Sequence, residues 1–236
     1  MAESGGLFVI DAETGDTTQF SSTFAGGSNS ITANASAKNN GDYGFKMLFD
    51  GAYDTAYGMK SITPADEIYL RFYIYIPSSL TIAVGYTMRV FGANEPLSNQ
   101  VRFGIYNAYG TMMWKLQVAY DSVDFADEFA LDTWIRVEIR YLKHTTNGGA
   151  EAWINGTKYA SDLDQDLSTQ ISSVYIGACQ CGSNPDAGDY FYLDDIKADT
   201  SYIGAYAAGG GVDTAKKRMS ATHLLVPSFP MAILPD

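Results

Sequence analysis

The chain has 236 residues, of which 46% are hydrophobic and 14% aromatic. It is therefore long enough to bury a sizeable core and too apolar to be a disordered chain. Its formal net charge of −12 excludes nucleic acid and anionic membranes as natural partners, because both are bound mainly through Lys and Arg. We find no signal peptide and no run of about 20 apolar residues that could cross a membrane, so we expect synthesis in the cytoplasm.

Apolar and polar residues alternate with a period of two along most of the chain, a pattern that predicts β-strands. The clearest example is segment 67–76, in which five apolar side chains from Ile68 to Ile76 fall on one face and Pro77 ends the strand. The other segments with strand-like patterns are 6–10, 28–35, 43–49, 86–91, 101–106, 113–120, 134–142, 150–154, 158–160, 172–177 and 189–199.

Turn signals separate these segments. Asn155-Gly156 predicts a two-residue hairpin, because a type I′ turn needs positive φ at both central positions. A short helical turn is expected only near 162–168. About a dozen strands with turns between them indicate an all-β fold. We predict a two-sheet antiparallel jelly-roll sandwich over residues 1–206, followed by an extended C-terminal arm.

The composition changes after Tyr206. Residues 207–215 are rich in Ala and Gly and are typical of a flexible linker. Residues 216–236 begin with a basic cluster and continue as an apolar stretch with three prolines, which favour an extended arm over a helix. Such an arm needs a partner surface, either on its own sandwich or on a neighbouring subunit. Its apolar contact residues are Leu224, Leu225, Val226, Phe229, Met231, Ile233 and Leu234.

Several segments, in order, resemble the concanavalin A-like lectin/glucanase superfamily, in its laminin-G-like and polysaccharide-lyase-like branches. They are FVIDAETGDTTQFS near the start, LRFYIYIP and TWIRVEIRY in the middle, the hairpin GAEAWINGTKYA, and YFYLDDIKADTSYIG near the end. The resemblance covers roughly residues 6–206 and implies a jelly roll, but a fold alone does not define an activity. The tail KKRMSATHLLVPSFPMAILPD resembles the C-terminal ends of structural proteins from tailed bacteriophages.

No complete catalytic constellation is present, so we predict no catalytic residues. Glycosidases of this superfamily place two carboxylates on one strand in a Glu-x-Asp-x-x-Glu pattern. This sequence lacks the pattern, and the alternating carboxylates of 162–166 are expected in a solvated loop. Alginate-lyase-like relatives combine Arg-x-Glu-x-Arg with a Gln-x-His pair and a Lys/Tyr motif. Arg136-Val-Glu138-Ile-Arg140 matches the first motif in form, but the other two are absent.

The strand surfaces offer a carbohydrate-binding face instead. Tyr stacks on sugar rings, while Arg, Lys and Gln bind hydroxyl or carboxylate groups. We expect the polar side of segment 67–76 and that of three further segments to share a sheet; the alternative is a subunit contact or an ordinary surface. The candidate glycan-binding residues are Tyr69, Arg71, Tyr73, Tyr75, Arg102, Lys115 and Gln117, with Arg89 and Tyr106 beside them.

Calcium is the ion that the sequence favours, because hard carboxylate oxygens suit it. In jelly rolls that this chain resembles, acidic residues of the first strand meet an Asp of the last strand and join the termini. The matching positions are Asp11, Glu13, Gly15 and Asp195, and the alternative is a set of carboxylates that cap turns. Adjacent Asp194 and Asp195 should point to opposite faces of their strand, so only one of them should face the core.

We therefore expect a non-enzymatic virion protein, namely a capsid decoration, fibre or tail component. Its arm would bind a second copy or other virion proteins, and its sandwich would bind a host-surface glycan. A stand-alone carbohydrate-binding module is the first alternative, and a polysaccharide lyase or glycoside hydrolase is the second. The three hypotheses predict, in turn, assembly through the arm, glycan binding that is lost on Tyr73→Ala or Arg71→Ala, and turnover.

Overall fold

The computed structural model describes residues 6–52, 55–94, 100–119, 121–183 and 185–205, with 121–128 described by their backbone alone. The predicted linker and arm, 207–236, lie outside these residues. Within the described part, the regular structure consists of β-strands and one 3-10 turn, Ala35–Ala37. No helix of this part is long and apolar enough to span a membrane.

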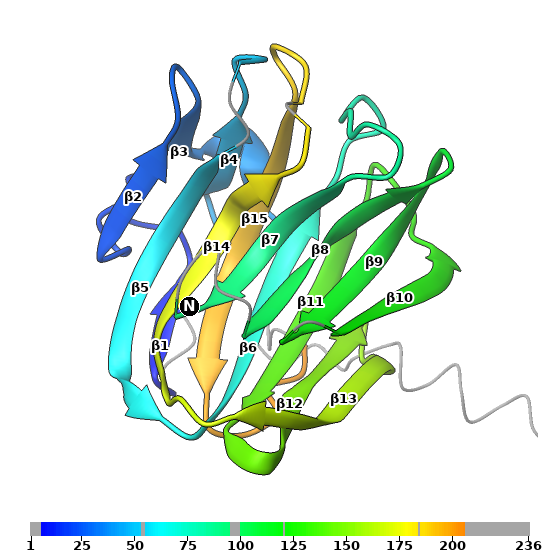
Figure 1. The fold of residues 1–236 in the computed structure, drawn as a ribbon. Coiled ribbons are helices and arrows are strands. Elements are labelled where there is room, and N and C mark those ends of the chain that lie inside the picture. Colours follow the sequence, from blue (N-terminus) through cyan, green and yellow to red (C-terminus); the bar gives the residue numbers. More distant parts are fainter. Residues whose placement is uncertain (1–5, 53–54, 95–99, 120, 184, 206–236) are drawn as a thin grey trace, which may run out of the picture. The chain divides into compact units, whose positions relative to one another are not determined.

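The strands form two antiparallel sheets, which lie one behind the other in Figure 1. The first has eight strands in the order β13-β12-β11-β6-β15-β4-β3, with β1 paired to β15. These strands are β1 (Phe8–Ile10), β3 (Ser30–Asn34), β4 (Gly44–Leu48), β6 (Glu67–Tyr75), β11 (Trp134–Leu142), β12 (His144–Ile154), β13 (Thr157–Leu167) and β15 (Tyr190–Asp199).

The second sheet has seven strands in the order β10-β9-β8-β7-β14-β5-β2. They are β2 (Ser22–Ala25), β5 (Ala56–Ala65), β7 (Thr87–Ala93), β8 (Val101–Ala108), β9 (Thr111–Val118), β10 (Asp121–Glu128) and β14 (Ile171–Cys181). This arrangement confirms the predicted two-sheet antiparallel sandwich.

The core lies between the inner faces of the two sheets. On β6 the apolar side chains of the period-two pattern, such as Leu70 and Phe72, have no exposed surface. On the neighbouring strand β11 the same holds for Val137, which lies directly opposite Phe72. Burying each such side chain contributes about 1.5–3 kcal/mol. The alternation therefore fixes which face of each strand points inward and leaves the opposite face for polar residues.

The hairpin between β12 and β13 confirms one local prediction and corrects another. Asn155 and Gly156 both have positive φ, 51° and 89°, as a type I′ turn requires. The expected helical turn at 162–168 and loop at 162–166 are wrong, because β13 continues to Leu167 and pairs with β12. The expected solvation holds for Asp164 and Asp166, which are exposed. Backbone pairing along β12 and burial of Leu167 outweigh the polar character of this segment.

The first and last strands pair, as the sequence suggested, but β15 is irregular. Its register with β6 shifts between Asp194 and Lys197, and Asp195 has a φ of 48°. A bulge of this kind interrupts the alternation of side chains. Asp194 and Asp195 are therefore both buried, with 0% and 4% of their surface exposed. Both carboxylates accept hydrogen bonds from Asn39, Asp194 from its backbone N–H and Asp195 from its side-chain amide. That only one of the two faces the core stays a prediction.

Candidate functional site

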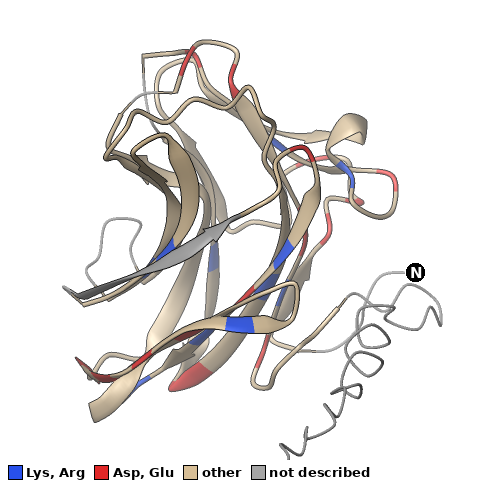
Figure 2. Ribbon diagram, turned by 90° about the vertical axis from the view of Figure 1, so that its right-hand side faces the viewer, with Lys and Arg blue, Asp and Glu red and all other residues tan. Residues whose placement is uncertain are grey.

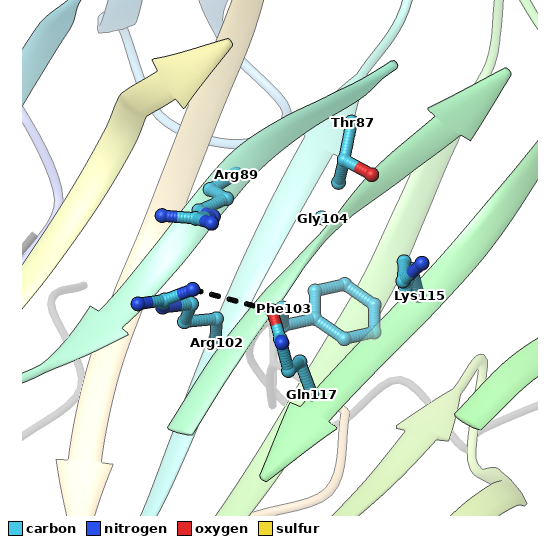
Figure 3. A pocket seen from close by; sticks show the side chains of 7 residues that line it. All are labelled: Thr87, Arg89, Arg102, Phe103, Gly104, Lys115 and Gln117. Atoms are coloured by element: carbon cyan, nitrogen blue, oxygen red, sulfur yellow. Dashed lines mark hydrogen bonds between the residues drawn. The ribbon is translucent and has the colours of Figure 1, made fainter. Parts of the chain in front are cut away.

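A hollow of about 210 Å³ opens on the outward face of the seven-stranded sheet, over β7, β8 and β9. Directly opposed residues of antiparallel strands share a face, and the register places Gly104 between Arg89 and Lys115. Because Gly104 has no side chain, the space above it stays open between the two cations. The hollow, shown in Figure 3, is lined by Thr87, Arg89, Arg102, Phe103, Gly104, Lys115 and Gln117.

The glycine at the base of the hollow is required by the pairing of β7 with β8. The register of these strands shifts between Arg89 and Phe91. A Cβ atom on Gly104 would collide with the backbone oxygen of Met88. The absence of a side chain at Gly104 thus keeps the hollow open, while the neighbouring ring of Phe103 is fully buried and stacks on Trp114.

Two arginines lie together on one side of the hollow, and Lys115 lies on the other (Figure 3). Arg89 donates a hydrogen bond to the neutral amide oxygen of Gln180 and forms no ion pair with a described carboxylate. Burial lowers the pKa of Arg89. Burial and the neighbouring charge of Arg89 lower the pKa of Arg102 to about 10. An anion bound between the two guanidinium groups would offset both effects.

The other side of the hollow carries groups that can exchange protons and hydrogen bonds. The ammonium nitrogen of Lys115 lies 4.6 Å from the centre of the Tyr106 ring. Tyr106 is half-buried and lies opposite Thr87 on the outward face. Arg102 Nη1 donates a hydrogen bond to Gln117 Oε1 at 3.3 Å, which orients the amide beside the arginines. The hollow therefore combines cations, an amide and a hydroxyl, and the phenol of Tyr106 lies beside its lysine.

The charges of this acidic protein are unevenly placed. Most described Lys and Arg residues lie on strands, whereas many Asp and Glu residues lie in loops and turns (Figure 2). None of the seven residues that line the hollow is acidic. A locally cationic surface can therefore exist on a chain with a net charge of −12.

The aromatic side chains on the same face were missed by the sequence analysis. Tyr57 lies 5.6 Å from Tyr175 and 5.5 Å from Phe24, measured between ring centres. The sequence analysis predicts no strand at β2 or β5; in β5, Gly58 and Pro64 interrupt the alternation. Tyr175 lies inside a predicted strand, and its place between two buried apolar residues was a signal that could have found it.

The predicted glycan face is divided between the two sheets. Arg102, Lys115 and Gln117, with Arg89 and Tyr106, do share the outward face of the seven-stranded sheet. The predicted neighbours Tyr69, Arg71, Tyr73 and Tyr75 lie on β6, in the eight-stranded sheet. The expectation of one common sheet is wrong, because β6 pairs with β11 and β15 over long sequence distances that local alternation does not encode.

The outward face around Arg71 is covered by the chain that follows β15. Arg71 is 1% exposed. It donates hydrogen bonds to the carbonyl oxygens of Gly204 at 3.4 Å and Asp195 at 3.3 Å. The ring of Tyr202 packs against Tyr69. Arg71 is therefore a buried structural group and is not available to bind a glycan.

The Arg-x-Glu-x-Arg segment also lies on the eight-stranded sheet, on β11. Glu138 is fully buried and accepts hydrogen bonds from the backbone N–H groups of Ile203 at 2.6 Å and Gly204 at 3.0 Å. Burial raises its pKa. Arg140 forms ion pairs with carboxylates of β6 and β12, each at 2.7 Å. The motif that matches alginate-lyase-like relatives in form thus holds the fold together, away from the hollow.

The four residues predicted to bind calcium, Asp11, Glu13, Gly15 and Asp195, do not form a ligand cluster. Their three carboxylates accept hydrogen bonds from nearby N–H groups of the protein. Among the described residues, no group of three or more His, Cys, Asp or Glu side chains could hold a metal ion. Calcium binding stays a prediction.

Neither a protein-family model nor a curated protein sequence matches this chain. Solved structures do. An endo-β-1,4-glucuronan lyase from the fungus Trichoderma reesei aligns with a TM-score of 0.58 at 11% identity, over 84% of this chain and 96% of the lyase. An alginate lyase in complex with an alginate trisaccharide aligns at 0.53 and 14% identity, over 82% and 98%. A carbohydrate esterase from a Shiga toxin-encoding bacteriophage aligns at 0.57 and 10%, over 84% and 99%.

These similarities establish the fold, a jelly-roll sandwich that carbohydrate-active enzymes share. They also overturn the expectation of a non-enzymatic virion protein, because the solved structures that share the fold include polysaccharide lyases and a carbohydrate esterase. The expectation depended on the resemblance of the C-terminal tail, which lies outside the described residues.

Proposed function

We propose that this protein is an enzyme that binds an acidic polysaccharide on the outward face of its seven-stranded sheet and cleaves it by β-elimination. The observation that carries the proposal is the hollow over Gly104, where Arg89, Arg102 and Lys115 gather with Gln117 and no lining residue is acidic. The shared fold of a glucuronan lyase and an alginate lyase supports it, since both enzymes act on polymers of uronic acids.

The hollow suits one uronate unit of a longer chain. Its volume of about 210 Å³ is below the roughly 300–1,000 Å³ of pockets that enclose a whole drug-sized ligand. A carboxylate between Arg89 and Arg102 would receive charge-assisted hydrogen bonds from both guanidinium groups. These bonds would also stabilise the negative charge that spreads onto the carboxylate when the neighbouring C5–H bond is broken.

The elimination itself is a redistribution of one proton and two electron pairs. A base removes the proton from C5, the C–H electrons form the C4=C5 double bond, and the C4–O bond to the next sugar breaks. The departing oxygen then takes up a proton, so the reaction needs no oxidant or further reactant. We assign the proton transfer to Tyr106, which would take the C5 proton as the phenolate and return it to the departing oxygen as the phenol. Its ring lies beside Lys115, which lines the hollow.

The proposal is tested by incubating the full chain with glucuronan, alginate and a neutral β-1,4-glucan. Cleavage by elimination creates a double bond conjugated to the carboxylate, which is followed by ultraviolet absorbance, and chain shortening is followed by size-exclusion chromatography. We expect unsaturated products from at least one acidic polymer and none from the neutral glucan. Binding without any unsaturated product, or no interaction with either acidic polymer, would show that the proposal is wrong.

Two arginine variants localise the activity. Arg89→Gln removes a cation of the hollow and should lower kcat/KM by at least roughly 100-fold. Arg140→Gln is the matched control, because Arg140 is also a strand arginine but belongs to the ion pairs of the other sheet. Its kcat/KM should stay within about twofold of the wild type. Tyr106→Phe keeps the ring beside Lys115 and should abolish turnover while leaving polymer binding intact.

A further inference from the structure

We infer that the polysaccharide-binding surface continues from the hollow onto an aromatic strip, formed by Phe24, Tyr57 and Tyr175, and that the substrate is a long acidic chain bound across the strands. This inference rests on the proposed function, because it extends the same site to further sugar units. In this arrangement the strip packs against the faces of sugar rings, and the hollow binds a carboxylate.

The register shows that the strip and the hollow share one face. Tyr175 on β14 lies opposite Gly92 on β7, and Gly92 lies opposite Arg102 on β8. Opposed residues of antiparallel strands point to the same side, and the alternation of Tyr175 with buried Val174 and Ile176 confirms that this side faces outward. Gly92 has no side chain, so no side chain separates Tyr175 from Arg102 along this row.

The strip continues to the edge of the sheet. The ring of Tyr57 contacts that of Tyr175 edge-on, with an interplanar angle of 68°. Phe24 on the edge strand β2 stacks on Tyr57 with an angle of 25° and is 52% exposed. Burial raises the pKa of the Tyr57 hydroxyl. An exposed aromatic side chain that is continuous with a polar cleft is typical of a binding surface.

The chemistry of the two parts fits a chain of uronate sugars. The apolar C–H faces of pyranose rings pack on aromatic side chains, whereas carboxylates pair with Arg and Lys. From β8 to β2 the sheet crosses four strand spacings, about 19 Å at about 4.8 Å each. A surface of this length exceeds a single sugar ring. The site therefore suits a polymer that is held over several units and cleaved within the chain.

The test compares a long polymer with a short one. Affinities for alginate polymer and for alginate trisaccharide are measured with the full chain, in a Tyr106→Phe background that prevents cleavage. Phe24→Ala should weaken polymer binding by roughly 3- to 10-fold and leave trisaccharide binding unchanged. Tyr159→Ala is the matched control, because Tyr159 is a similarly exposed aromatic residue (41%) on β13, the edge strand of the other sheet. It should change neither affinity.

The outcomes separate the strip from the proposed function. If Phe24→Ala weakens both ligands equally, or neither, the strip is not a subsite and the inference is wrong. Arg89→Gln tests the hollow in the same assay and should weaken both ligands. A different result is that Phe24→Ala weakens binding of the polymer alone while Arg89→Gln weakens binding of neither ligand. That result would keep the strip as a glycan-binding surface and reject the proposed function of the hollow.

Discussion

The outward faces of the two sheets carry the same kinds of residue but use them differently. On the eight-stranded sheet, Arg140 is paired with carboxylates, and Arg71 and Glu138 are buried beneath the chain that follows β15. On the seven-stranded sheet, Arg89 and Arg102 face a hollow with no acidic lining residue. One face pairs its charged groups with one another or with the backbone, and the other gathers cations around a hollow whose lining contains no acidic residue.

The comparison shows that a sequence motif typical of an active site can occur in a chain without marking the position of the candidate site. The Arg-x-Glu-x-Arg spacing is present on β11, where its groups stabilise the fold. The residues that we propose to bind a uronate come from three other strands and share no sequence motif. Replacing residues on each face should therefore separate effects on stability from effects on function.

The largest effect on stability should come from Glu138→Ala. The substitution leaves the backbone N–H groups of Ile203 and Gly204 without their acceptor and removes a buried negative charge beside Arg71 and Arg136. We expect the free energy of unfolding to fall by about 3–5 kcal/mol, measured by urea denaturation. Affinity for an acidic polymer should not change while the variant remains folded. A loss below about 1 kcal/mol would mean that this face is not held together by Glu138.

The pH dependence of stability should reflect the same carboxyl group. Burial raises the pKa of Glu138 above its ordinary value of 4.5 in the folded protein. Its contribution is therefore fully present below pH 4.5 and is lost as the pH rises through the folded-state pKa. Several surface carboxyls, such as Asp66, have lowered pKa values and act in the opposite sense. The free energy of unfolding of the wild type minus that of Glu138→Gln isolates the contribution of Glu138. This difference should fall, in favour of the variant, as the pH rises.

A smaller effect is expected for Arg140→Gln. Its partner Glu151 is nearly buried, with 6% of its side chain exposed, whereas Arg140 itself is 21% exposed. Loss of the two ion pairs should cost about 1–2 kcal/mol, between the values for exposed and buried pairs. Turnover of an acidic polymer should be retained. If turnover falls with stability unchanged, the motif on β11 is part of the active site and the comparison of the two faces fails.

The sequence predicts the inward face of each regular strand because burial of alternate side chains, as on β6, is a local pattern. It does not predict which strands become neighbours. Arg71 and Arg102 look alike in the sequence, yet one is covered by Gly204 and the other lines the hollow. That difference depends on pairings between distant segments, on the register shift near Arg89, and on a strand, β5, whose alternation is interrupted.

The smallest expected effect has the opposite sign to the others and concerns Arg89→Gln. The Arg89 guanidinium is partly desolvated, it lies beside Arg102, and its hydrogen-bond partner is a neutral amide. A cation held in this way lowers the stability of the ligand-free protein, a cost that functional sites commonly carry. Replacing it should leave the free energy of unfolding unchanged or raise it by up to about 1 kcal/mol. Adding an acidic oligosaccharide should then stabilise the wild type against thermal unfolding and not the variant. A clear loss of stability in ligand-free Arg89→Gln would instead place Arg89 among the structural arginines, with Arg71 and Arg140, and would remove the distinction between the two faces.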